Sequence, residues 1–230
     1  MKKNILIVGG SSGVGQKLAR HYVTDGHTVC ITGRKNPNLE GARFQPLAIT
    51  ENTSDLIREI DQLAEDFPIV NTLIYAAGYL QRGHIDDLGD GDLQTMVNVG
   101  LLAPMMLVQR LKRSTSNPLK IMLITSSSQY TPREFEPAYC ATKSGLGMLG
   151  AALVRDGEIG KVLVVAPSRI NTPFWVGTDE NTETMLDPEW VADQIIALSS
   201  GAFKYKYAKL FRNPARSEIV ECLDNSFHQI

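Results

Sequence analysis

Short apolar runs alternate along this chain with longer segments in which apolar and polar residues recur at helical spacing. The short runs are continuous and rich in β-branched residues, which is typical of strands that are buried on both faces. A weaker run of the same kind lies at residues 44–47. The strong runs predict five buried strands, at residues 5–8, 28–32, 71–75, 120–125 and 161–166.

The segments between these runs predict helices. Val14, Leu18 and Tyr22 follow one another at intervals of four residues, which places them on one helix face. Strands and helices that take turns predict right-handed βαβ units. We therefore expect an α/β fold, with a single Rossmann-type doubly wound parallel β-sheet and helices on both faces. Further helices are expected near residues 56–63, 92–113, 139–155 and 187–200.

No internal repeat, low-complexity tract or linker interrupts this pattern, so we expect a single domain over residues 1–230. The segment after Ser200 departs from the alternation of strand and helix. We expect it to add a strand near 208–211 and a short helix near 217–223.

Composition narrows the class of protein. The 230 residues are 43% hydrophobic and 21% charged, and the net charge is −2, so neither nucleic acid nor a membrane surface is expected as a partner. Cys30, Cys140 and Cys222 are far apart, and they predict neither a disulfide framework nor a metal site. The apolar run at 5–8 is too short for a signal peptide or a membrane span, so we expect a cytoplasmic protein.

A glycine-rich turn joins the first predicted strand to the first predicted helix. Gly9, Gly13 and Gly15 lie in the sequence GGSSGVG, where glycine lets a pyrophosphate approach the backbone closely. The helix N-terminus that follows favours phosphate, and the hydroxyls of Ser11 and Ser12 can add donors. A plain glycine-rich loop is the alternative. The position between strand and helix favours a dinucleotide site.

The end of the second predicted strand indicates which dinucleotide is bound. Sites for NAD carry a carboxylate here, which accepts a hydrogen bond from the ribose 2′-hydroxyl. This chain has Gly33, Arg34 and Lys35 instead, and a guanidinium suits a 2′-phosphate. We therefore expect NADP(H) to be preferred over NAD(H), against the alternative of a solvated surface Arg–Lys pair.

Five sequence elements together resemble the short-chain dehydrogenase/reductase family over about residues 4–200. Ser126 precedes Tyr139 by the 13 positions common in that family. The order and spacing of the elements are more specific than any one of them. The elements are GGSSGVG at 9–15, YAAG at 75–78, Asn98 in MVNVG, Ser126 with YCATK at 139–143, and APSRINT at 166–172.

The resemblance implies the roles of four catalytic residues. Tyr139 would donate a proton to the substrate carbonyl oxygen or accept one from the alcohol. Lys143 and an oxidised nicotinamide would lower the tyrosine pKa, and Lys143 would also hold the nicotinamide ribose. Ser126 would position the substrate oxygen, and Asn98 would hold a water that links Lys143 to solvent. The alternative for each of them, taken singly, is an ordinary structural side chain.

The resemblance and the glycine turn together give the expected cofactor contacts. Some positions depart from the family pattern. Tyr75 and Ala76 replace two asparagines, Ala48 replaces the aspartate near the adenine, and Ser168 replaces a glycine. The expected contacts are Gly9, Ser11, Ser12, Gly13, Val14, Gly15, Arg34, Lys35, Ala76, Ala77, Gly78, Tyr139, Lys143, Pro167, Ile170 and Thr172.

The segment after Thr172 is expected to act as a mobile lid over the substrate. In it, Phe174 and Trp175 would either shield the nicotinamide or pack the lid onto the core. Three arginines fall on segments that rim such pockets. We hypothesise that one or more of them receives an anionic substrate group, against the alternative of surface arginines. The three are Arg82, Arg133 and Arg169.

The expected function is NADP(H)-dependent reduction of a carbonyl group in a small metabolite, or oxidation of the corresponding alcohol. In one interpretation this metabolite is anionic. Two alternatives stay open, namely a nucleotide-sugar epimerase or dehydratase and a non-catalytic NADP-binding regulatory protein. The helix expected at 93–111 and the stretch 146–154 of the helix expected at 139–155 are apolar nearly all round, which requires burial on every side. We therefore expect a homodimer or homotetramer through these helices.

Overall fold

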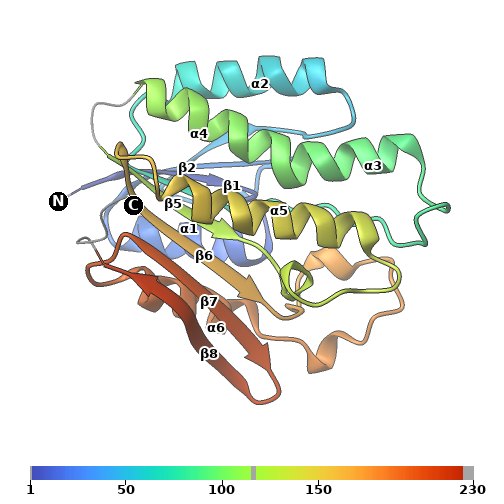
Figure 1. The fold of residues 1–230 in the computed structure, drawn as a ribbon. Helices are drawn as coiled ribbons and strands as arrows, with labels where there is room; N and C mark the ends of the chain where they lie inside the picture. The colour runs from blue at the N-terminus through green and yellow to red at the C-terminus, as the bar shows by residue number, and fades with distance from the viewer. Residues whose placement is uncertain (1, 115–117, 225–230) are drawn as a thin grey trace.

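The computed structural model describes residues 2–114 and 118–224, and its centre is one eight-stranded sheet (Figure 1). The strand order is β3-β2-β1-β4-β5-β6-β7-β8. All neighbouring strands are parallel except β7 and β8. The strands are β1 (Asn4–Val8), β2 (Thr28–Gly33), β3 (Ala42–Pro46), β4 (Thr72–Tyr75), β5 (Leu119–Ile124), β6 (Ile159–Pro167), β7 (Tyr205–Arg212) and β8 (Ala215–Leu223).

Helices cover both faces of the sheet, as the alternating sequence pattern predicts (Figure 1). On β1, Leu6 and Val8 join one apolar core, while Ile5 and Ile7 join the other, because successive strand residues point to opposite faces. The first core is shared with α2, α4 and α5, and the second with α1 and α6. The helices are α1 (Gly13–Thr24), α2 (Thr53–Asp66), α3 (Asp90–Val97), α4 (Ala103–Ser114), α5 (Pro137–Leu153) and α6 (Pro188–Ser199).

Side-chain caps fix where two of these helices begin. Asn52 accepts hydrogen bonds from the backbone N–H groups of Ser54 and Asp55 at the start of α2. Asp187 does the same for Glu189 and Trp190 at the start of α6, and Pro188 occupies the first helical position, where no backbone donor is needed. Asp187 and Pro188 together therefore set the start of the helix expected near 187–200.

The long helix predicted at 92–113 forms, but a π-helical turn interrupts it. The turn, η1 (Asn98–Leu102), joins α3 to α4, and such turns recur at functional sites. The whole run, Asp90–Ser114, is long and apolar enough to cross a membrane by length and composition alone. Half of its most apolar window is buried inside the protein, where α4 packs against α2 and η1 against α5.

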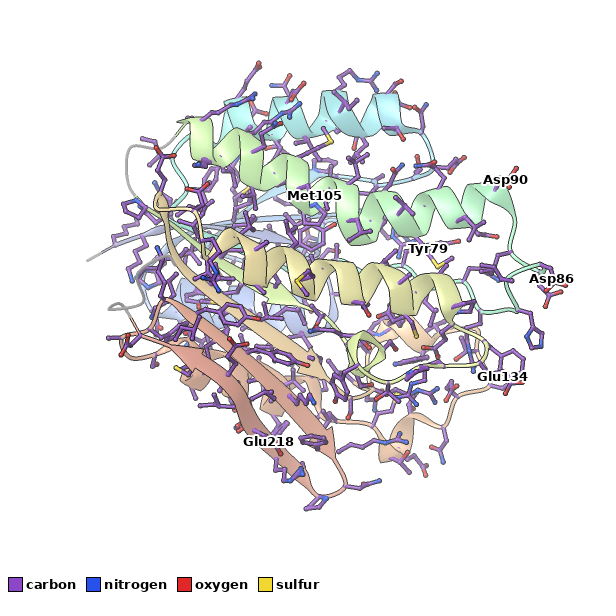
Figure 2. All side chains as sticks on the ribbon, viewed as in Figure 1. Tyr79, Asp86, Asp90, Met105, Glu134 and Glu218 are labelled. Carbon is purple, nitrogen blue, oxygen red and sulfur yellow. The ribbon has the colours of Figure 1, made fainter. Side chains whose placement is uncertain are left out.

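The helix expected near 217–223 is wrong, because these residues form most of strand β8. Strand β8 pairs antiparallel with β7 and makes the outer edge of the sheet (Figure 1). The adjacent Ile219 and Val220 are β-branched, which favours a strand over a helix. The strand expected at 208–211 lies within β7. Figure 2 shows Glu218 on this outer strand.

The remaining short elements are single 3₁₀ turns that lie in the loops around the ends of β5 and β6. These loops meet at the carboxyl ends of the parallel strands (Figure 1), which is where α/β sheets bind their ligands. The turns are η2 (Ser127–Gln129), η3 (Pro173–Trp175) and η4 (Thr182–Thr184).

Candidate active site

A pocket of about 310 Å³ opens at the carboxyl ends of the central strands. The glycine turn after β1 lines one part of it, and Tyr139, Lys143 and Ser126 line another. The loop after β6, including Phe174 and Trp175, completes the wall. One pocket thus joins the predicted cofactor turn to the predicted catalytic residues.

The glycine turn has no room for side chains at two of its positions. Gly9 has a φ of +82°, and a Cβ on it would lie 2.6 Å from Ala77 N. A Cβ on Gly15 would lie 2.3 Å from the Gly9 carbonyl oxygen. Helix α1 begins directly after Ser12, whose side chain makes no cap hydrogen bond. The first backbone N–H groups of α1 are therefore available to an anion at the mouth of the turn.

The structure brings nearly all of the predicted cofactor contacts together. Lys35 is the exception, because it is exposed and does not line the pocket. The predicted contacts that line the pocket are Gly9, Ser11, Ser12, Gly13, Val14, Gly15, Arg34, Ala76, Ala77, Gly78, Tyr139, Lys143, Pro167, Ile170 and Thr172.

Tyr139 and Lys143 lie one turn apart on α5, and both side chains are buried. The Lys143 Nζ is 5.5 Å from the centre of the Tyr139 ring and donates a hydrogen bond of 3.4 Å to the Ile124 carbonyl. Tyr139 shares a hydrogen bond with Ser126. The three side chains therefore form one cluster on the pocket wall.

Burial controls the protonation of this pair. It raises the pKa of the Tyr139 phenol, and the hydrogen bond with Ser126 only partly opposes this. It lowers the pKa of the Lys143 ammonium from 10.5 to about 8, because the charged form loses its hydration. The expected lowering of the Tyr139 pKa is therefore not found in this structure, where burial raises it and the charge of Glu136 adds to the increase.

Asn98 is placed differently from the other three predicted catalytic residues. It is fully buried at the start of the π-helical turn and does not line the pocket. Its Nδ2 donates to the Thr50 carbonyl at 2.8 Å, and its Oδ1 accepts from Gln94 Nε2 at 2.9 Å. The side chain thus ties η1 to the loop before α2, and its role in a water relay stays a prediction.

The comparisons with known proteins agree with this arrangement. The family model described as short chain dehydrogenase matches residues 3–183. This chain belongs to the short-chain dehydrogenase family. The match covers the glycine turn, the Tyr139–Lys143 pair and the loop that carries Phe174 and Trp175.

Similar proteins within this family have low sequence identity to the chain. An uncharacterized oxidoreductase of Staphylococcus epidermidis is 22% identical, over 85% of this chain and 90% of its own. The 3-oxoacyl-(acyl-carrier-protein) reductase MabA of Mycobacterium tuberculosis is 24% identical, over 80% and 75%. A solved short-chain dehydrogenase from Sphingobium yanoikuyae in complex with NADPH is 21% identical, with a TM-score of 0.76 and coverage of 85% and 83%.

Tyr75 departs from the short-chain dehydrogenase pattern, and the structure shows what it does. It is completely buried at the end of β4, and its hydroxyl donates to the Val99 carbonyl in the π-helical turn. The N–H of the next residue, Ala76, donates to the Val8 carbonyl at 2.8 Å. A phenol therefore braces the central strand against the central helix where the family pattern has an asparagine.

The sequence analysis did not identify Glu136, which is a buried carboxylate three residues before Tyr139. It is 4% exposed and lines the pocket. Its Oε2 accepts from Ser128 Oγ at 3.2 Å, and its Oε1 lies 3.6 Å from Arg169 Nη2. No motif marks this glutamate; only its position beside the tyrosine could have drawn attention to it. Other pocket residues missed from the sequence include Val8, Thr32, Leu47, Ile49, Tyr79, Val99, Thr125, Ser127 and Ser128.

Phe174 and Trp175 combine both of the interpretations made for them. The Phe174 ring lies 6.3 Å from the Tyr139 ring, so it covers the catalytic end of the pocket. Trp175 is buried and donates from Nε1 to the Ile170 carbonyl at 2.9 Å, which anchors the loop. Within the described residues, no group of three or more metal-ligating side chains occurs.

Proposed function

We propose that this short-chain dehydrogenase is an NADP(H)-dependent oxidoreductase that interconverts a carbonyl group and an alcohol in a small molecule. The observation that carries the proposal is one pocket that holds both the glycine turn and the cluster of Tyr139, Lys143 and Ser126. The glycine turn fits a dinucleotide, because its backbone is bare where a pyrophosphate needs close approach. The cofactor would supply the hydride chemistry.

Each polar residue of the cluster has its own role in this proposal. Tyr139 donates its phenolic proton to the carbonyl oxygen during reduction and accepts it back during oxidation. Ser126 donates a hydrogen bond to the same oxygen and fixes its position beside the phenol. Lys143 binds the ribose hydroxyls of the cofactor and, when protonated, stabilises the phenolate that remains after proton transfer. Phe174 limits the access of water to this end of the pocket.

A preference for NADP(H) rests on the end of β2. Arg34 lines the pocket there, and Gly33 before it carries no carboxylate. A Cβ on Gly33 would lie 2.2 Å from Ser11 Oγ, so an acidic side chain cannot be added without moving the glycine turn. The similar Sphingobium protein was solved with NADPH, which supports the assignment. The proposed preference for NADP(H) does not depend on Lys35.

The cofactor assignment is tested by comparing NADPH and NADH with wild-type protein and with Arg34→Ala. We expect the variant to raise the dissociation constant for NADPH by about tenfold or more, since a charged hydrogen bond contributes about 1.5–3 kcal/mol. The dissociation constant for NADH should change little. An equal loss for both cofactors would contradict a role for Arg34 at the 2′-phosphate.

The proposed chemistry is tested with Tyr139→Phe and a panel of small aldehydes and ketones. Loss of a general acid lowers turnover by about 10²–10⁴-fold, and NADPH binding, followed by its fluorescence, should persist. Tyr130→Phe is the matched control, because Tyr130 is half-buried nearby but does not line the pocket. Undiminished turnover by Tyr139→Phe would refute the mechanism, and cofactor binding by wild-type protein with no turnover of any carbonyl would favour a regulatory protein.

We also propose that the enzyme is a homodimer or homotetramer that assembles through α4 and α5. The two helices lie side by side on one face of the sheet (Figure 1). Large apolar side chains remain exposed on them, with Met105 44% and Met148 69% exposed, and Figure 2 labels Met105 on this face. Light scattering should show an oligomer that Met148→Glu weakens; a monomeric wild type would refute the proposal.

A further inference from the structure

Three arginines from three separate loops lie at the end of the pocket that carries Tyr139: Arg133 and Arg169 line it, and Arg82 does not line it but lies 3.9 Å from the pocket carboxylate Glu136. Arg82 follows β4, Arg133 precedes α5, and Arg169 follows β6. Two carboxylates, Glu136 and Glu180, lie among them. The three arginines and two carboxylates have a formal net charge of +1. The arginine that forms no ion pair with a carboxylate is therefore the one available to a substrate.

Arg82 and Arg169 form ion pairs with carboxylates of the protein. Arg82 Nη1 lies 2.8 Å from Glu180 Oε1, and Arg169 pairs with the other Glu180 oxygen. The same two guanidiniums flank Glu136, with Arg82 Nε 3.9 Å and Arg169 Nη2 3.6 Å from its Oε1. The carboxylate side chains are 15% and 5% exposed. Because buried carboxylates require such partners, we expect both arginines to stay paired with them and not with a substrate.

Arg133 holds the surplus charge. It forms no ion pair with any residue in the described ranges 2–114 and 118–224, and its Nη2 donates a single hydrogen bond of 3.1 Å to Ser127 Oγ. Arg133 lines the pocket together with Ser126 and Tyr139. The adjacent Glu134 is exposed and does not line the pocket, and Figure 2 shows it on the loop at this end of the molecule.

We infer that Arg133 is the residue that selects the substrate, and that the substrate is an oxo acid whose carboxylate pairs with its guanidinium. The inference rests on the proposed carbonyl–alcohol chemistry and adds the substrate class to it. The remaining N–H groups of Arg133 present the planar donor pair that a carboxylate accepts. Ser127, which Arg133 contacts, is the next residue after Ser126. Arg133, which would bind the carboxylate, thus lies beside Ser126, which would bind the reacting carbonyl oxygen. We therefore expect one small molecule to carry both groups.

The charge balance favours a carboxylate over a phosphate. A phosphate ester carries a charge of about −1.5 to −2 near neutral pH, whereas the surplus around Arg133 is a single positive charge. Glu136 and Glu180 lie within the same group of side chains, and their negative charge would oppose a dianion. A monoanion matches Arg133, the one guanidinium of these three that forms no ion pair in the described residues, and this narrows the sequence-based hypothesis that one or more of the three receives an anionic group.

The test compares each of three acids with its methyl ester, namely pyruvate, acetoacetate and levulinate. Binding is measured by calorimetry with Tyr139→Phe and NADPH, which avoids turnover, and KM and kcat are measured with the otherwise wild-type enzyme. We expect at least one acid to bind about tenfold or more tightly than its ester. Arg133→Met should remove that advantage, raise KM for the acid at least tenfold, and leave the ester unchanged. Arg133→Lys should restore part of the advantage.

Two kinds of control separate recognition from structure. Arg110→Gln alters an arginine paired with Asp61 outside the pocket, and it should change nothing. Arg169→Gln should impair acids and esters alike, since Arg169 holds two internal carboxylates. The inference fails if no acid binds better than its ester, if Arg133→Met affects both equally, or if Arg169→Gln alone acts on acids selectively. Acid binding through Arg133 without any reduction would instead refute the proposed function and leave the acid site in place.

Discussion

Replacing Lys143 by methionine should stabilise the protein while it abolishes activity. Lys143 is 3% exposed, and the only hydrogen bond of its Nζ in the described part of the chain is the 3.4 Å contact with Ile124. Burial lowers its pKa from 10.5 to about 8. At 1.36 kcal/mol per pKa unit, keeping the ammonium charged in the fold costs about 3 kcal/mol near neutral pH. Methionine has a similar length and carries no charge.

The pH dependence of this gain identifies its cause. Below about pH 8, Lys143 is protonated in both the folded and the unfolded chain, so the folded state bears the full cost. Between about 8 and 10.5 the unfolded chain binds the proton and the folded chain releases it, so the cost falls as pH rises. The advantage of Lys143→Met should therefore shrink from about 3 kcal/mol near pH 7 to about 1 kcal/mol near pH 9.5.

Urea unfolding of wild-type and variant protein at these two pH values measures both numbers. Lys17→Met is the control, because Lys17 pairs with Glu189 on the surface and its loss should cost no more than about 1 kcal/mol. A Lys143→Met protein that is no more stable than wild type near pH 7 would refute the reasoning. So would a gain that is the same at both pH values. The expected trade of stability against activity is typical of a charge that is buried for function.

Three further predictions follow from contacts described above. Tyr75→Phe leaves the buried Val99 carbonyl without its donor and should lower the free energy of unfolding by about 1–3 kcal/mol, measured by urea denaturation. Glu180→Gln weakens the pairs with Arg82 and Arg169, so hydrogen exchange should accelerate in the loop at 173–187 while global stability changes by less than about 1 kcal/mol. Gly9→Ala places a Cβ 2.6 Å from a backbone nitrogen, and its NADPH titration should show at least a tenfold loss of affinity. Unchanged unfolding, exchange or affinity, respectively, would contradict each prediction.

The central sheet could be predicted from the sequence because its strands are buried on both faces and read as continuous apolar runs. The run at residues 161–166, for example, falls within β6. Strand β8 was not predicted from the sequence, because it lies at the edge of the sheet and is exposed along nearly its whole length. With no buried face, its apolar residues follow no period that a strand would require. The apolar spacing of Ile219 and Leu223 imitates a helix turn.

The candidate site was predictable where a motif fixes the backbone, and less so where side chains meet across loops. Gly9 and Gly15 are needed for close backbone approach, and sequence spacing alone indicates that. The pairing of Glu180 with Arg82 and Arg169 joins residues up to 98 positions apart, so no local pattern encodes it. The direction of the Tyr139 pKa shift also required the structure, because the extent of burial and the contact with Glu136, both of which raise the pKa, cannot be deduced from the sequence.

The contact between Ser11 and Gly33 has an evolutionary consequence. The serine Cβ would lie 2.6 Å from any Cβ introduced at position 33, so an aspartate there and the present serine exclude each other. A lineage that changed its preference from NADP(H) to NAD(H) would have to replace Ser11 by glycine before it could gain an aspartate at position 33. The order of substitutions is therefore constrained: Ser11→Gly has to come first, with the loss of a hydroxyl that lines the pocket, and the aspartate becomes accessible only on that background.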